Sequence, residues 1–528
     1  MHLLDYIVIA AYLGVTIWLG ILFSRGQSRN EFFNAGRSMS WLPVGLSVMA
    51  TLFSSNSFVF YPSAAYSSSL RIGLSLVAFS LAVPIVAWFF VPVYTRLDCQ
   101  TAYEYLERRF GLPVRCLASG LFVFLRIGWM ASATYAASLV VASMADVPQP
   151  AVILVLGVVS IAYTILGGLR AVMWTDVLQF FIFAGTIVIA LVLVFSFDSP
   201  VARDGAGGPL TRYFAAREHV LFDFTRSMTL TYGSWAILIG VFLEALSAYG
   251  ADQVAVQRYL SASSEQVSQR GLFVNLAGTW LVVPSLLCIG AGLFIFYGDH
   301  PEELTPLFQD DAAIQELASA ENPEAVARLV TSQNHQDKIL PQFVKTHFPW
   351  GGKGLFLAAL MAAIMSSIDS GIHSVTTALV VDFRDRLRPN WKPQSDRQDV
   401  FQIRLLTVTI GILSVGLALF VGPLGDVFTI GKMMTAAFGG PLLAVFLLAF
   451  FSPRSTMFGV FGGTLASAAI TLALMVQHPE WFAVWFWPIG FGMAMLLSWG
   501  LSLLPIGKAH PEPLTWKRVV HDVGENGT

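Results

Sequence analysis

Long apolar runs separated by short polar gaps fill the chain from its first residues to about position 505. A run of about 20 mostly apolar residues can cross the hydrocarbon core of a bilayer as a helix. By that measure the sequence predicts about thirteen membrane-spanning helices. They begin near Leu3, Ser40, Ile72, Leu117, Ala151, Val172, Thr229, Phe273, Gly354, Leu405, Val427, Met457 and Ala483.

The composition agrees with a chain that is solvated by lipid. Of its 528 residues, 55% are hydrophobic and 12% are charged, whereas soluble domains carry about 25% charged residues. The net charge of −2 provides no basic field for nucleic acid. The three cysteines form no CxxC pair, so the sequence indicates neither a disulfide framework nor a zinc site. We expect one transmembrane domain over 1–528, with a short polar tail over 506–528.

Lysine and arginine gather in alternate polar gaps, as the positive-inside rule requires of cytoplasmic loops. The gaps at 145–149, 422–426 and 477–481 hold neither residue. We therefore expect a multi-pass protein of the inner (plasma) membrane with its N-terminus outside and its C-terminus in the cytoplasm. The expected cytoplasmic segments contain Arg25, Arg29, Arg37, Arg96, Arg108, Arg109, Arg115, Arg258, Arg270, Arg384, Arg386, Arg388, Lys392, Arg397, Lys508, Lys517 and Arg518.

The second span has a polar interruption in its middle. Between Thr51 and Ser57 the chain carries four hydroxyl residues and Asn56. These hydroxyls can bond back to their own helix, or the segment can leave the helix and line a cavity. Irregular backbone at membrane depth is tolerated only away from lipid, which favours the cavity.

The ninth span, which contains AAIMSSIDSGIHS, places small and hydroxyl residues on one helical face: Ala363, Ser366, Ser367, Ser370 and Ser374. Sodium is a hard cation that is bound by hydroxyl, carbonyl and carboxylate oxygens, and this face offers several of them. A small-residue face also lets membrane helices pack closely. Asp369 on the same span favours a functional role, because an acid within the membrane is functional by default.

Four more charged residues lie within or near spans. Asp176 either stabilises the start of the sixth span or shares a cation with Asp369. Glu244 and Lys432 either pair with each other or contact a solute. Arg126 is expected to snorkel to an interface.

The sequence contains no nucleophile with its base, no GxxxxGK phosphate loop and no HExxH pair. An enzyme is therefore not expected. Without a nucleotide site, transport would be driven by an ion gradient or would run passively.

Five stretches resemble the sodium/solute symporter family, which includes sodium-coupled sugar, proline, sialic acid, monocarboxylate and iodide carriers. They are TAYEYLERRFG, ILGGLRAVMWTDVLQ, YGADQVAVQRYLSA, AAIMSSIDS and GPLLAVFLLAFF, in the family's order. The resemblance implies an all-α membrane protein with a LeuT-type inverted five-helix repeat and discontinuous helices. The repeats would cover 39–197 and 229–452, followed by extra C-terminal helices over 453–505.

The resemblance also implies site residues. The main sodium site would be formed by Ala50, Phe53, Ala363, Ser366 and Ser367. A second sodium would be held by Asp176, Ser366, Asp369 and Ser370, although Asp369 stands where the sialic acid branch has a hydroxyl. The solute would contact Ser54, Asn56, Ser57, Tyr61, Glu244 and Lys432.

The solute itself stays open at this point. In the sialic acid branch an arginine on the fourth span holds a carboxylate, and here Trp129 stands at that position, with Arg126 one turn away. A small organic anion is slightly favoured over sugars, polyols and amino acids. A solute-sensing receptor and a channel are the rival functions, and the oligomeric state cannot be predicted from the sequence.

Overall fold

Every regular element in the described part of the chain is a helix, apart from an isolated bridge between Met39 and Ala262. A computed structural model describes residues 1–24, 27–53, 55–197, 208–217, 220–320, 322–388, 390, 393, 395–421, 427–506 and 513–525, without the side chains of 55–56, 427–430, 432 and 521–525. Ser54 and the side chains of Asn56 and Lys432, all predicted to contact solute, therefore lie outside the described residues.

Within those residues, ten helices are long and apolar enough to cross a bilayer, and two bent helix pairs raise the number to twelve. The spanning elements are α1 (Leu3–Leu22), α3 (Trp41–Leu52) with α4 (Ser55–Ser67), the run Leu70–Arg96 with α5 (Ser75–Ile85) and α6 (Val91–Arg96), α8 (Leu112–Ala145), α9 (Gln149–Ser196), the turn Ala236–Val241 with α11 (Phe242–Gly250) and α12 (Gln253–Ser261), α13 (Glu265–Asp299), α17 (Gly352–Ala378) with α18 (Asp385–Leu387), α19 (Asp396–Phe420), α20 (Val427–Phe451), α21 (Met457–Gln477) and α22 (Phe486–Ser502).

Helix α9 is long enough to cross a bilayer twice. Its 48 residues are more than twice the length that a membrane crossing needs. Gly168 within it has φ 56° and ψ −156°, so the helix is interrupted there. A Cβ atom at Gly168 would lie 2.9 Å from the Phe32 carbonyl oxygen, so both conformation and packing require glycine. The sequence predicts two spans over this region, beginning near Ala151 and Val172, and Gly168 lies between those two positions.

Two spans are discontinuous, as predicted. Between α3 and α4 the axis bends by 58°, and between α11 and α12 it bends by 46°. The first break follows Leu52, inside the polar interruption seen in the sequence. The second falls at Ala251–Asp252, and Asp252 caps α12 by accepting a hydrogen bond from the Val254 N–H. Each bent pair stands at the start of one of the predicted repeats.

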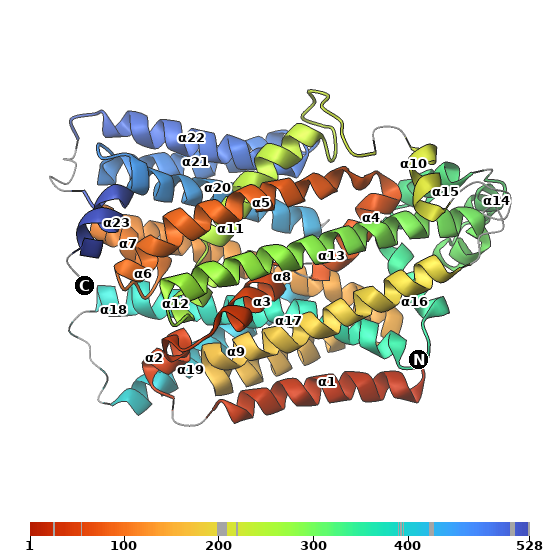
Figure 1. Ribbon diagram of the computed structural model, residues 1–528, viewed down its shortest axis with the longest axis horizontal. Coiled ribbons are helices and arrows are strands. Elements are labelled where there is room, and N and C mark those ends of the chain that lie inside the picture. Colours follow the sequence, from red (N-terminus) through yellow and green to blue (C-terminus); the bar gives the residue numbers. More distant parts are fainter. Residues whose placement is uncertain are drawn as a thin grey trace.

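The two termini lie at opposite ends of the bundle (Figure 1). The short helices α2 (Arg29–Asn34), α7 (Ala102–Phe110) and α23 (Trp516–Glu525) lie at the end that contains the C-terminus. The opposite end carries α10 (Pro209–Ala216), α14 (Asp311–Ala318) and α15 (Pro323–Ser332), while α16 (Ile339–His347) leads into α17.

Helix α17 is the central element. Every residue from Phe356 to Ala378 is buried, so protein rather than lipid surrounds it on all sides. Its N-terminus is capped from another helix, since Asp5 of α1 accepts hydrogen bonds from the Gly351 N–H (2.9 Å) and the Gly354 N–H (3.0 Å). A carboxylate at this position satisfies free N–H groups and complements the helix dipole.

Candidate ion and solute sites

The serine pair of α17 lies against the break that ends α3. The Ser366 hydroxyl lies 2.9 Å from the carbonyl oxygen of Ala50 and 3.1 Å from that of Ala363. The Ser367 hydroxyl lies 3.3 Å from the carbonyl oxygens of Thr51 and Ala363. Phe53 ends α3 with non-helical angles of φ −94° and ψ 89°. The structure thus brings two hydroxyls and the backbone of the broken helix to one place.

A cavity of about 10 Å³ lies beside these oxygens, and four of the five predicted main-site residues line it: Ala50, Phe53, Ala363 and Ser366. That volume holds about one water-sized sphere. Neutral oxygen donors around so small a space fit a dehydrated alkali ion, because carbonyls freed at a helix break can replace its hydration shell.

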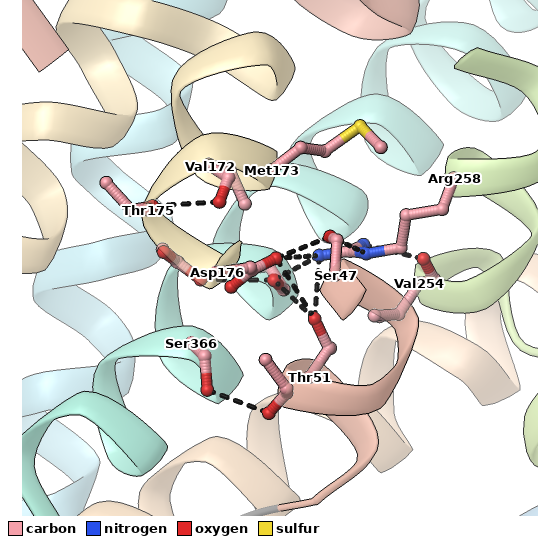
Figure 2. Close-up of polar contacts among 12 residues, drawn as sticks. Ser47, Thr51, Val172, Met173, Thr175, Asp176, Val254, Arg258 and Ser366 are labelled. Atoms are coloured by element: carbon pink, nitrogen blue, oxygen red, sulfur yellow. Dashed lines mark hydrogen bonds and ion pairs between the residues drawn. The ribbon is translucent and has the colours of Figure 1, made fainter. Parts of the chain in front are cut away.

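Asp176 does not meet Asp369 directly but pairs with Arg258 of α12. Figure 2 shows the two side chains meeting between Ser47 and Thr51 of α3. The Arg258 Nη2 lies 3.3 Å from Asp176 Oδ2, and both side chains are fully buried. Ser47 donates to the same carboxylate oxygen at 2.6 Å, and Arg258 also donates to Ser47 (3.0 Å) and Thr51 (2.9 Å). The expectation that Arg258 lies in a cytoplasmic loop is therefore wrong, because α12 folds back into the protein as the second half of a broken span.

Asp369 has a separate set of partners. Tyr163 of α9 donates its hydroxyl to Asp369 Oδ2, and the Ser370 hydroxyl lies 3.1 Å from Oδ1. Ser370 also accepts from Arg258 and lies 3.1 Å from the Thr51 hydroxyl. The two acids are therefore linked through Ser370, while the Ser366 hydroxyl faces the carbonyls of Ala50 and Ala363 instead.

A cavity of about 500 Å³ lies on the other side of the α3–α4 break. Of the predicted solute contacts, Ser57, Tyr61 and Glu244 line it. It is also lined by Met49 and Phe53, which line the small cavity as well. The two cavities thus share part of a wall. This volume suits a small organic molecule.

Arg126 lines the larger cavity and does not reach an interface. Its side chain is 6% exposed and forms an ion pair with Asp252, at the break between α11 and α12. The prediction that Arg126 snorkels is therefore wrong. The buried carboxylate of Asp252, rather than solvent, supplies the counter-charge for Arg126.

A third buried ion pair lies toward the end of the bundle near the C-terminus. Arg115 of α8 lies 2.6 Å from Asp382, and both side chains are fully buried. Asp382 also accepts from Thr101 (2.6 Å) and Ser119 (2.8 Å). We call these four residues the inner ion-pair cluster. The sequence predicts Arg115 in a cytoplasmic loop, whereas in the structure it lies in the first turns of α8 and is buried.

Sequence reasoning missed Arg258, Tyr163 and the inner ion-pair cluster as interior features. The available signal was the acid at each partner position, because Asp176 and Asp382 both follow long apolar stretches. Buried acids require a counter-charge or donors, and the bases that serve them were the arginines assigned to loops.

Broken helices, a serine pair against the carbonyls of one break and a solute-sized cavity that shares Met49 and Phe53 with the small cavity are features of ion-coupled carriers. Residues 32–467 match the Sodium:solute symporter family. The chain is 30% identical to the sodium/sialic acid symporter NanT of Aliivibrio fischeri over 89% of this chain and 87% of that protein. It is 29% identical to the human sodium/iodide cotransporter (89% and 69% covered) and 27% identical to mouse sodium-coupled monocarboxylate transporter 1 (89% and 72% covered).

A solved structure of a Na⁺-coupled sialic acid symporter, in a substrate-bound outward-open state, superimposes with a TM-score of 0.81 at 25% identity. The match covers 96% of this chain and all of that one. The chain belongs to the Sodium:solute symporter family. It is a multi-pass membrane protein of the LeuT-type fold that couples the transport of an organic solute to sodium, so the predicted family, fold class, coupling ion and type of transport are confirmed.

Proposed function

We propose that the protein carries a small organic anion into the cell with sodium by alternating access, and that Ala50, Phe53, Ala363, Ser366 and Ser367 bind the main sodium ion. The observation that carries the proposal is the contact of the Ser366 hydroxyl with the Ala50 carbonyl at 2.9 Å, beside the small cavity. Movement of α17 relative to the α3–α4 break would dismantle such a site, so ion occupancy and conformation are coupled.

The preference for an anion rests on the relatives. Sialic acid, iodide and monocarboxylates, which the similar proteins are named for, are all anions at neutral pH. A sodium ion at the α3–α4 break would offset the charge of an anion in the larger cavity, since Met49 and Phe53 line both spaces. In this proposal Ser57, Tyr61 and Glu244 contact the solute, and no covalent step is involved.

We place the second sodium beside Asp369. Within the described cluster of Asp176, Arg258 and Asp369, the guanidinium balances one carboxylate, and Asp176 is the acid that it contacts. A second buried carboxylate without a cation is costly in the membrane interior. A sodium ion between Ser366, Asp369 and Ser370 would balance it.

We further propose that the N-terminus faces the outside and the C-terminus the cytoplasm of the inner (plasma) membrane. The termini lie at opposite ends of the bundle (Figure 1), and the direction rests on the gathering of lysine and arginine in the expected cytoplasmic segments. Surrounding lipid, sodium and solute are the proposed partners, and nucleic acid is not among them.

Replacing Ser366 and Ser367 by alanine tests the main site. We expect the double variant to raise the sodium concentration for half-maximal binding at least about tenfold, which corresponds to about 1.4 kcal/mol for two lost ligands. Sodium binding is measured by tryptophan fluorescence of the purified protein, titrated with sodium chloride against choline chloride.

The matched control is Thr376→Ala, which removes a buried hydroxyl whose one hydrogen bond among the described residues goes to the Ile372 carbonyl of its own helix. Its sodium affinity should equal that of the wild type. An unchanged affinity in the Ser366→Ala/Ser367→Ala variant would remove the basis for the site.

A further inference from the structure

Helix α2 lies beside α9 and α19 at the end of the bundle that contains the C-terminus (Figure 1). It has six residues, and two of them are phenylalanines with buried side chains: Phe32 is 0% exposed and Phe33 is 3% exposed. Both rings lie against the ring of His373 on α17, at centroid separations of 5.2 and 6.1 Å. This short helix therefore enters the protein interior instead of lying on its surface.

Side chains of two spanning helices bind the C-terminal carbonyls of α2. His373 of α17 donates from Nε2 to the Phe32 carbonyl at 2.9 Å, and Gln257 of α12 donates to the Phe33 carbonyl at 2.8 Å. The last carbonyls of a helix have no partner within that helix. Here α12 and α17 supply the donors, so the docked position of α2 depends on how those two helices are placed.

The two ends of α2 are held in different ways. Arg29, its first residue, pairs with Asp385 of α18 and lies 3.3 Å from Asp399 of α19. The three residues that follow α2, at 35–37, all have φ between 51° and 64°. Alanine and arginine adopt this left-handed conformation only where surrounding contacts require it. The turn from α2 into α3 is therefore strained while α2 is docked.

One face of α17 leads from the proposed sodium site toward α2. After Ser366 and Ser367, hydroxyls recur at Ser370, Ser374 and Thr377, at spacings of three or four residues. All five residues are buried, and Thr377 lies about 15 Å along the helix from Ser367. Polar side chains buried within a membrane mark ion pathways. This face thus offers oxygens to a sodium ion on its way to the C-terminal end of the bundle.

Gln257 connects the far end of this hydroxyl face to α2. Its amide oxygen accepts from Ser374 at 2.9 Å, and its amide nitrogen donates to Thr377 at 2.9 Å. The same nitrogen donates to the Phe33 carbonyl. While α2 is docked, the last two hydroxyls of the face are therefore engaged by a side chain that α2 also holds.

An apolar cluster follows the hydroxyl face. Phe32 and Phe33 pack with Val380 and Val381, which come after Thr377 along the chain. These side chains offer no oxygen ligands, so moving a bare sodium ion through them would be costly. We propose that α2 is a lid on the sodium path, which must leave α12 and α17 before sodium is released at this end of the bundle. This inference rests on the proposed sodium site.

The lid is connected to both broken spans. The strained turn at 35–37 leads into α3, whose end supplies the Ala50 carbonyl to the sodium site. Met39, just before α3, donates from its N–H to the Ser261 carbonyl (3.1 Å) and accepts from the Ser263 N–H (3.2 Å), at the end of α12. A movement of α3 or α12 that dismantles the sodium site therefore also pulls on α2.

The test measures whether two reporter cysteines can be reached from water. The full chain carries serine at Cys99, Cys116 and Cys288 and is purified in dodecyl maltoside, so that both ends of the bundle are accessible. Ser374→Cys reports on the hydroxyl face, and Ala248→Cys, in a separate protein, reports on the larger cavity that Ala248 lines. The labelling rate of each reporter by a water-soluble methanethiosulfonate is compared among variants.

Two variants weaken the lid. Phe32→Ala/Phe33→Ala removes both rings, and it should speed the labelling of Ser374→Cys at least about tenfold. His373→Phe keeps a ring of similar size and loses the hydrogen bond to α2, so it tests the lid should the double variant fail to fold, and we expect a severalfold rise. Both variants should slow the labelling of Ala248→Cys, because loss of the lid shifts the population away from the state with an open larger cavity.

Phe343→Ala is the matched control. It removes a ring that is 0% exposed from α16, at the opposite end of the bundle, and should leave both labelling rates unchanged. The proposal is overturned if neither lid variant speeds the labelling of Ser374→Cys, or if Phe343→Ala speeds it equally. It is also overturned if Ser374→Cys reacts faster while Ala248→Cys keeps its rate, since α2 would then fray without opening the path.

Sodium separates this proposal from the sodium site on which it rests. In the protein with an intact lid, sodium chloride in place of choline chloride should slow the labelling of Ser374→Cys, because a bound ion favours the docked state. If sodium changes none of these rates while both lid variants keep their effects, the proposed sodium site is wrong and the assignment of α2 as a lid remains.

Discussion

The ion pair between Arg258 and Asp176 makes a quantitative prediction about stability. Arg258→Met removes the guanidinium and all its contacts, and leaves Asp176 buried with only the hydroxyls of Ser47 (2.6 Å) and Thr51 (3.4 Å) as partners. Removing one member of a buried pair costs about 3–5 kcal/mol. We expect that loss for Arg258→Met, and about 3 kcal/mol for Asp176→Asn, because Arg258 then keeps its other acceptors.

The double variant Asp176→Asn/Arg258→Met removes both charges of the pair and leaves Asp369 with its own partners, Tyr163 and Ser370. It should lie within about 2 kcal/mol of the wild type, since replacing a whole buried pair by neutral groups of similar volume is often close to neutral. The double-mutant cycle then gives a coupling energy of several kcal/mol. The free energy of unfolding is measured in mixed micelles of dodecyl sulfate and dodecyl maltoside.

Arg328→Met is the control, because Arg328 lies on the surface with 79% of its side chain exposed, beside Glu324. Its effect should be below about 1 kcal/mol. If the effects of the two single variants at the buried pair simply add, the two charges do not stabilise each other and the reasoning fails.

Two further predictions concern the inner ion-pair cluster and the bend in α9. Asp382→Asn should loosen the end of the bundle where Arg115 and Asp382 pair at 2.6 Å. In a background with serine at Cys116 and Cys288, labelling of the buried Cys99 by N-ethylmaleimide should then rise severalfold. Unchanged labelling would show that the ion pair does not hold this end closed. Gly168→Ala should lower the thermal midpoint of unfolding, since a Cβ there meets the Phe32 backbone at 2.9 Å and φ is 56°, a strain of about 1–3 kcal/mol. Gly185→Ala on the same helix, with nothing within 4 Å, should not lower the midpoint, and equal effects of the two changes would contradict this account.

The parts of the fold that depend on local sequence could be predicted. Apolar length located the spans, and the hydroxyls between Thr51 and Ser57 located the first helix break, because both signals are contained within one segment. The serine pair on α17 could be recognised for the same reason. Its meeting with Ala50 joins positions more than 300 residues apart and depended on the family resemblance.

The errors arose where a charge is balanced over a long separation in sequence. Arg258 follows an apolar run and therefore resembles a cytoplasmic flank, yet its partner Asp176 lies 82 residues earlier. Arg115 pairs with Asp382 across 267 residues. Neither hydrophobic periodicity nor the positive-inside rule can predict such pairings, because they depend on how α8, α9, α12 and α17 pack in three dimensions.

Helix α1 lies at the edge of the bundle, yet through Asp5 it holds the N-terminus of the central helix α17. By holding the amides of Gly351 and Gly354, it anchors the helix that bears the serine pair. Affinity tags or signal sequences fused next to the first few residues would disturb the contact of Asp5 with α17. Expression designs should therefore leave this end native and attach their reporters at the other terminus.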